Sequence, residues 1–170
     1  MRHLYTIAFT SILGLFSYQS IAAADLEITW QAPENYTDML ASNEPQQRFH
    51  EKTFKKLDNT LAQLTEKLPD GQKLQIKVKD LDLAGRVSAG LERGDYGPRT
   101  FNSLDMPRIS FTYQLIDASG KVLQASAVEL EDPMFLSSFN PRRNNGPLPY
   151  EKRMLRKWFK EEFTQLIAKS

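Results

Sequence analysis

The segment Lys73–Gly85, KLQIKVKDLDLAG, decides the fold. Its first half alternates between apolar and polar side chains, which is the pattern of a β-strand with one buried face. The apolar positions are Leu74, Ile76 and Val78. We therefore predict a central strand here, followed by a loop that begins at Ala84.

The alternation changes phase in the second half of this segment. Continuing it would place Asp80 and Asp82 on the buried face and would turn Leu81 away from it. Because side chains in a strand repeat every two residues, such a slip moves the whole apolar set to the wrong face. We predict a β-bulge or the end of the strand near Lys79 and Asp80, which leaves two carboxylates where the strand leaves the sheet.

The bulk composition is that of a globular protein. The chain has 170 residues, no cysteine and a hydrophobic fraction of 41%, with 22 Lys and Arg residues against 21 Asp and Glu residues. This length is sufficient for one domain with a substantial core. A net charge near zero gives no reason to expect nucleic acid or an anionic membrane surface as the main partner.

The first 24 residues have the pattern of a secretory signal peptide. Arg2 and His3 supply a positive start, an apolar stretch follows, and three alanines precede Asp25. We predict cleavage after Ala24, a single domain over residues 25–170 and a periplasmic location. The interspersed Ser, Thr and Gln residues make this segment a poor membrane span, so we expect no stable membrane insertion after cleavage.

Periodicity predicts the elements on either side of the central strand. Alternation over residues 26–31 predicts a first strand. The apolar stripe from Phe54 to Leu68 has helical spacing and predicts a long amphipathic helix, which Ser42 or Asn43 can cap and Pro69 ends. This helix connects the first strand to the central one.

The second half of the chain alternates between strands and irregular stretches. Residues 84–106 and 132–149 are rich in glycine, proline and charged residues, and we predict loops there. Between them, strands over 107–116 and 121–131 form a hairpin. A final amphipathic helix begins at Pro149 or the residue after it.

The predicted order of elements is β-α-β-β-β-α. The simplest architecture is an α+β two-layer sandwich, in which two helices pack on one face of a four-stranded mixed sheet. The first two strands are parallel through a right-handed helical crossover, and the later strands alternate in direction.

This topology brings the unusual residues to one end of the sheet, which we call the pole. The pole gathers the turn after the first strand, the end of the central strand, both irregular stretches and the start of the last helix. Ligands tend to bind at the carboxyl ends of parallel strands, and helix N-termini favour anions. The candidate binding residues at the pole are Tyr36, Asp38, Asp80, Asp82, Arg86, Arg99, Arg108, Arg142 and Tyr150.

Three interpretations of these residues stay open. Arg and Asp side chains in long loops commonly pair and hold the loops down, because buried charges need partners. The same side chains can instead form a binding surface for a protein or a small ligand. Alternatively, Asp80, Asp82 and Glu131 can ligate Ca²⁺ or Mg²⁺ through oxygen, as part of a metal-binding module or a metal-dependent enzyme.

The segment after residue 24 offers few groups for catalysis. Its single histidine is His50 and it has no cysteine, so a Ser/His/Asp or Cys/His arrangement would have to use that histidine. Because His50 lies within the amphipathic helix, we expect it to have a structural role. No phosphate-binding glycine motif is present. We therefore expect a non-enzymatic protein that needs no cofactor.

Several segments resemble a bacterial domain-of-unknown-function family, number 3016. The most specific are DLDLAG at residues 80–85 and YEKRML at residues 150–155. Pro107–Ile109, the hairpin turn at 117–123 and Trp158-Phe159 extend the resemblance over nearly all of the chain after the signal peptide. The resemblance implies a small secreted protein, usually of Gram-negative bacteria, and it supplies no catalytic residues.

Together these observations predict a periplasmic binding or accessory module of the cell envelope. We expect it to bind a periplasmic or envelope protein through the pole. The alternatives are the metal-binding module or metal-dependent enzyme, and a structural subunit of an oligomer.

Overall fold

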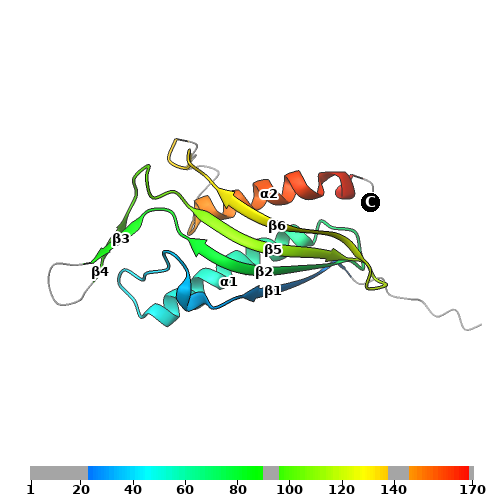
Figure 1. Ribbon diagram of the computed structural model, residues 1–170, viewed down its shortest axis with the longest axis horizontal. Coiled ribbons are helices and arrows are strands. Elements are labelled where there is room, and N and C mark those ends of the chain that lie inside the picture. Colours follow the sequence, from blue (N-terminus) through cyan, green and yellow to red (C-terminus); the bar gives the residue numbers. More distant parts are fainter. Residues whose placement is uncertain (1–22, 90–95, 138–145, 169–170) are drawn as a thin grey trace, which may run out of the picture.

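The computed structural model describes residues 23–89, 96–137 and 146–168 (Figure 1). The elements are β1 (Asp25–Trp30), the short 3-10 helix η1 (Pro33–Asn35), α1 (Gln46–Thr65), β2 (Lys73–Asp82), β3 (Arg86–Ala89), β4 (Tyr96–Thr100), β5 (Arg108–Ile116), β6 (Val122–Glu131) and α2 (Pro149–Ile167). Within these ranges, four strands form one sheet in the order β1-β2-β5-β6, while β3 and β4 pair separately. β1 is parallel to β2 and the other pairs are antiparallel. The predicted α+β fold with a four-stranded mixed sheet and two helices is confirmed.

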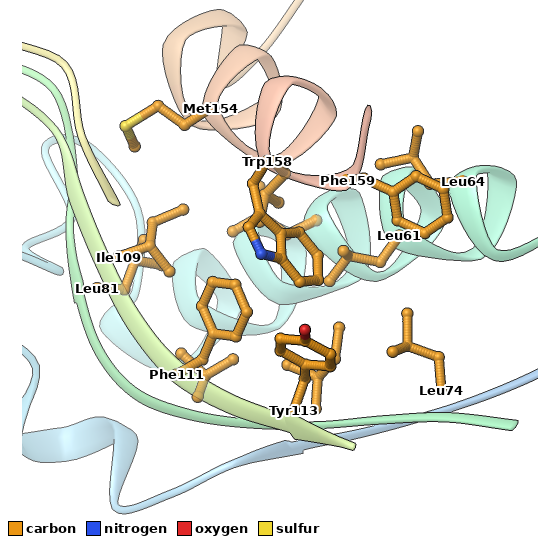
Figure 2. Close-up of a cluster of buried hydrophobic side chains, with 14 of the residues drawn as sticks. Leu61, Leu64, Leu74, Leu81, Ile109, Phe111, Tyr113, Met154, Trp158 and Phe159 are labelled. Atoms are coloured by element: carbon orange, nitrogen blue, oxygen red, sulfur yellow. The ribbon is translucent and has the colours of Figure 1, made fainter. Parts of the chain in front are cut away.

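Both helices pack on the same face of the sheet (Figure 2). The inward positions of β2 and β5 alternate as predicted and are buried. Trp158 of α2 lies edge-on to Phe111 and Tyr113 of β5, with ring centroids 4.8 and 5.4 Å apart. Burial of a phenylalanine such as Phe111 stabilises the fold by about 1.5–3 kcal/mol. This packing fixes the helical layer against the two central strands and so fixes the position of their ends.

The predicted break in β2 is a β-bulge. The register between β2 and β5 shifts between Val78 and Asp80, so Lys79 is the extra residue. The strand then continues to Asp82, and Leu81 is completely buried. Because successive side chains of a strand point to opposite faces, Asp80 and Asp82 lie on the face away from the core. The bulge therefore restores the apolar phase and turns both carboxylates outward.

The start of α1 differs from the sequence prediction. The helix begins at Gln46 with Pro45 at its N-cap, and no side chain caps it. The Ser42 hydroxyl instead donates a hydrogen bond to the carbonyl oxygen of Gly97, 2.7 Å away. The Gln46 side chain accepts from the amide of Ala41 at 3.0 Å. The predicted capping by Ser42 or Asn43 is wrong, because the helix begins three residues after Asn43 and the Ser42 hydroxyl is used in a tertiary contact.

The stretch over 84–106, which we predicted to be a loop, contains the β3–β4 hairpin. The two strands pair antiparallel, with Val87 opposite Arg99. The strands are short, and β4 includes Gly97 and Pro98, residue types that are depleted in strands. The two segments are strands because they form hydrogen bonds with each other, although the residues of β4 have a low intrinsic preference for strands.

Figure 1 shows the elements of the pole at one end of the sheet. The β3–β4 hairpin extends from this end, next to the turn after β1, the end of β6 and the start of α2. The β5–β6 turn and the C-terminal end of α2 lie at the opposite end. No helix within the described ranges is long and apolar enough to cross a lipid bilayer.

Gly85, where the chain leaves β2, allows us to test how closely the hairpin approaches the sheet. Its φ is +76°, and an added Cβ would lie 2.3 Å from the carbonyl oxygen of Thr100 and 2.9 Å from Cδ1 of Phe101. We expect Gly85→Ala to lower the free energy of unfolding by at least about 3 kcal/mol, since backbone strain and overpacking add. Urea denaturation measures this change.

Gly120 is the matched control for this substitution. It has a similar φ of +85°, but an added Cβ would meet nothing within 4 Å. Gly120→Ala should therefore cost only about 1 kcal/mol, the penalty for the positive φ. Equal costs at the two glycines would contradict a tight contact between Gly85 and β4.

Candidate functional site

Asp80 connects the turn after β1 to the bulge of β2 through two hydrogen bonds. Its Oδ1 accepts from the Thr37 amide at 2.8 Å, and its Oδ2 accepts from the Thr37 hydroxyl at 2.6 Å. Both carboxylate oxygens are therefore occupied by one residue of the turn. The outward direction of this side chain follows directly from the bulge.

Arg99 of β4 connects three segments of the pole. Its Nη1 donates to Oδ2 of Asp38 at 2.8 Å, and its Nη2 donates to Oδ1 at 3.3 Å. The same guanidinium donates to the carbonyl oxygens of Gly85 at 2.8 Å, Ala84 at 3.4 Å and Leu40 at 3.3 Å. Both charged side chains are only 16% exposed. A bidentate pair this well enclosed positions the hairpin against β2 and the turn after β1.

Glu151 in the first turn of α2 was not among the predicted site residues, although it is a buried charge at the pole. Its side chain is 2% exposed, and Oε1 accepts from the Ala84 amide at 2.8 Å. Oε2 has no hydrogen-bond partner within the described ranges. Burial raises the pKa of this carboxyl, while the Ala84 amide and the charge of Arg99 act in the opposite direction. The sequence alone does not distinguish it from other acidic residues in a first helical turn, where a negative charge is favourable even when the side chain is exposed.

Four further ion pairs surround the pole, and Arg108 takes part in two of them. Arg108 donates to Asp82 at 3.2 Å and lies 3.9 Å from Glu131. Burial raises the pKa of Asp82, and Arg108 partly offsets this effect. The two other pairs are Arg86 with Asp105, at 2.8 Å, and Arg153 with Asp132.

The two candidate tyrosines are packing residues. Tyr36 is buried and donates its hydroxyl hydrogen bond to the carbonyl oxygen of Val78 at 3.1 Å. Burial raises the pKa of Tyr36 to about 12. The ring of Tyr150 packs edge-on against Phe135, with centroids 4.9 Å apart, and lies 5.8 Å from Phe101. These contacts form a small second core with Ala84 beneath the pole.

Large apolar side chains are exposed at the surface of the pole. Leu104 is 83% exposed, Met134 63% and Phe101 52%, and Leu40 and Leu136 are also exposed. We call these five residues the pole patch. Phe101 joins the patch to the second core through its contact with Tyr150. Sequence reasoning missed the patch, because an apolar residue in an irregular stretch can be buried or exposed equally well.

The structure thus brings eight of the nine candidate residues to the pole, and Arg142 lies outside the described residues. Each of the eight has a structural contact, and their binding role stays a prediction. Within the described ranges, no group of three or more His, Cys, Asp or Glu side chains could hold a metal ion. Asp80 and Asp82 are engaged by Thr37 and Arg108 respectively. His50 lies 3.0 Å from the carbonyl oxygen of Met39, through Nε2.

The family described as "Protein of unknown function (DUF3016)" matches residues 24–161. The chain belongs to this family. The match confirms the resemblance that the DLDLAG and YEKRML segments indicated. No curated protein matches the chain. Among solved structures, a variant PelC dodecamer from Paraburkholderia phytofirmans is similar at 18% identity, over 88% of this chain and 82% of that chain, with a TM-score of 0.33.

Replacing Arg99 by lysine tests how far the pole depends on its planar guanidinium. Lysine keeps the charge but cannot bind Asp38 through two parallel hydrogen bonds while also reaching the carbonyl groups. We expect Arg99→Lys to lower the free energy of unfolding by about 2–3 kcal/mol. Arg86→Lys is the control, because Arg86 is 68% exposed and such pairs contribute less than about 1 kcal/mol. Similar effects in urea denaturation would contradict the role given to Arg99.

Glu151 should make stability depend on pH. Because its pKa is raised in the folded protein, the native state holds the proton more tightly than the unfolded chain. Its contribution to the free energy of unfolding therefore falls as pH rises from the ordinary carboxyl range through the native pKa. Glu151→Gln lacks this titration, so its stability relative to the native protein should improve with rising pH. Urea denaturation of both proteins from acidic to neutral pH measures this; a constant difference would contradict it.

Proposed function

We propose that this protein is a non-enzymatic accessory module of the bacterial cell envelope, which binds a protein partner through the pole patch. The observation that carries this proposal is the exposure of Leu104, Met134 and Phe101 at one end of the molecule. Exposed apolar residues scattered singly are ordinary, whereas a group of them marks an interaction surface.

The framework beneath the patch supports this proposal. Arg99, Asp38 and Glu151 hold the hairpin, the turn after β1 and the start of α2 together, and Phe101 packs on Tyr150. A binding surface that is already ordered loses less conformational entropy when its partner binds. The ion pairs at the pole therefore serve the patch by positioning the segments that carry it.

The surroundings of the patch favour a protein as the partner. Both signs of charge lie close to the patch along the chain, since Asp105 follows Leu104 and pairs with Arg86, and Asp132 lies two residues before Met134 and pairs with Arg153. An apolar centre with a polar rim of mixed charge is typical of protein–protein interfaces. Nucleic acid instead requires an excess of positive charge. The envelope location rests on the predicted signal peptide and on the secreted character that the family resemblance implies.

Photo-crosslinking in living cells tests the proposal. A photoreactive amino acid replaces Leu104, and the adducts of the exported protein are identified by mass spectrometry. We expect one discrete protein adduct, because Leu104 is the most exposed large apolar residue of the pole patch. Introducing Met134→Asp into the same protein should strongly reduce the adduct, since a charge in an apolar interface must be desolvated.

Leu123 provides the matched control. It is an exposed leucine, 43% accessible, near the β5–β6 turn at the opposite end of the sheet. A probe at Leu123 should not give the adduct seen from Leu104. The same adduct from both positions would contradict a partner at the pole. Adducts of the protein with itself alone would instead support the role of an oligomer subunit.

A further inference from the structure

A second surface lies on the helical layer, away from the pole. It is a groove with a volume of about 640 Å³ between the C-terminal halves of α1 and α2. Both helices run away from the pole, so the groove belongs to the opposite end of the molecule (Figure 1). Leu64 and Phe159, which approach each other between the two helices in Figure 2, form its apolar floor together with Ile167.

Three cations line this groove. They are Lys67 of the segment after α1 and Arg156 and Lys160 of α2, and all three are exposed. None of the residues lining the groove is acidic. Within the described ranges, none of the three forms an ion pair with a carboxylate, in contrast to the paired arginines of the pole.

The positive charge continues along the seam between the helices. The pKa of Lys152 is lowered by its partial burial and then by repulsion from Arg156 and Lys56. A helix C-terminus attracts cations, which accounts for a lysine at the end of α1. This attraction acts only within the last turn, and Arg156 lies well before the last turn of α2. The cluster therefore lacks a compensating charge of its own, and a bound anion would supply one.

The neutral polar groups of the groove restrict the class of ligand further. The Thr60 hydroxyl donates to the carbonyl oxygen of Lys56 at 3.1 Å, and the Thr164 hydroxyl donates to that of Lys160. Their donor capacity is thus used within their own helices. Gln63 is the remaining neutral polar side chain that lines the groove, so sugars and peptides, which are recognised through many neutral hydrogen bonds, find few partners here. An apolar floor with cations at its edge instead suits an amphiphilic anion.

We propose that this groove binds a single-chain anionic lipid, with the acyl chain on the apolar floor and the acidic head group at Arg156 and Lys160. The volume lies within the range of small-molecule sites, roughly 300–1,000 Å³. This site is separate from the pole patch, so its failure would leave the proposed function untouched.

Laurate, kept below its micelle-forming concentration, is the probe for this site. Isothermal titration calorimetry of the purified protein should show one saturable site for laurate whose affinity falls as salt is added, since the head-group contact is screened. Dodecyltrimethylammonium, which has the same chain and the opposite charge, should not bind. Acetate, which has the head group alone, should not displace laurate.

Two variants and one control identify the groove as the site. Arg156→Glu combined with Lys160→Glu should weaken laurate binding by about tenfold or more, because two attractive charges become repulsive. Lys157→Glu changes the same charge on an exposed residue of α2 outside the groove, and should leave binding unchanged. Thr164→Trp fills the groove without changing its charge and should also abolish binding, with the urea unfolding midpoint serving as the check on folding.

Three outcomes would overturn the proposal. The first is equal binding of laurate and the cationic amphiphile, and the second is an equal loss of affinity in the double variant and in Lys157→Glu. The third is an absence of laurate binding together with a concentration-dependent mass in sedimentation, which would assign the groove to a second copy of the chain.

Discussion

The backbone of Ala84 and Gly85 is hydrogen-bonded to two charged side chains, Glu151 and Arg99, and the arrangement of the pole depends on these bonds. On one side the Ala84 amide donates to the buried carboxylate of Glu151, which belongs to α2. On the other side, the carbonyl groups of both residues accept from Arg99, which is itself paired with Asp38. The end of β2 is thereby connected to the hairpin, to the turn after β1 and to α2. Removing one charged partner would leave the other enclosed without compensation, which is costly in a protein interior.

The candidate charged residues of the pole have structural contacts, whereas the two proposed binding surfaces are made by other residues. Asp38 and Asp82 are paired with arginines, Asp80 accepts hydrogen bonds from Thr37, and these contacts connect the loops of the pole. Among the large apolar side chains of the pole, Leu104 is the most exposed, and it lies at the same end as exposed charged residues such as Arg86. On the helical layer, Arg156 and Lys160 lie beside an apolar floor, and within the described ranges neither forms an ion pair with a carboxylate.

The two surfaces lie at opposite ends of one packed core. The pole patch is carried by the segments that follow β1, β4 and β6, whereas the groove is formed by α1, α2 and the residues directly after them. Trp158 and Phe159 are adjacent in α2; one packs on the sheet and the other lines the groove. The same helix therefore supports the core and the second surface, and substitutions outside the core can address each surface separately.

The sequence by itself determined the elements whose signal is local. The alternation of Leu74, Ile76 and Val78, with the slip after Val78, was sufficient to predict the central strand and a bulge or strand end near Lys79, because the two faces of a strand repeat every two residues. Which of the two occurs was decided by the pairing with β5. The leucine stripe predicted α1, and the parallel pairing of β1 with β2 followed from the crossover. Only the tertiary structure decided which charges are partners and which side chains are exposed. The Arg99–Asp38 pair joins residues 61 positions apart, and the burial of Glu151 depends on where α2 docks, so no local pattern encodes either of them.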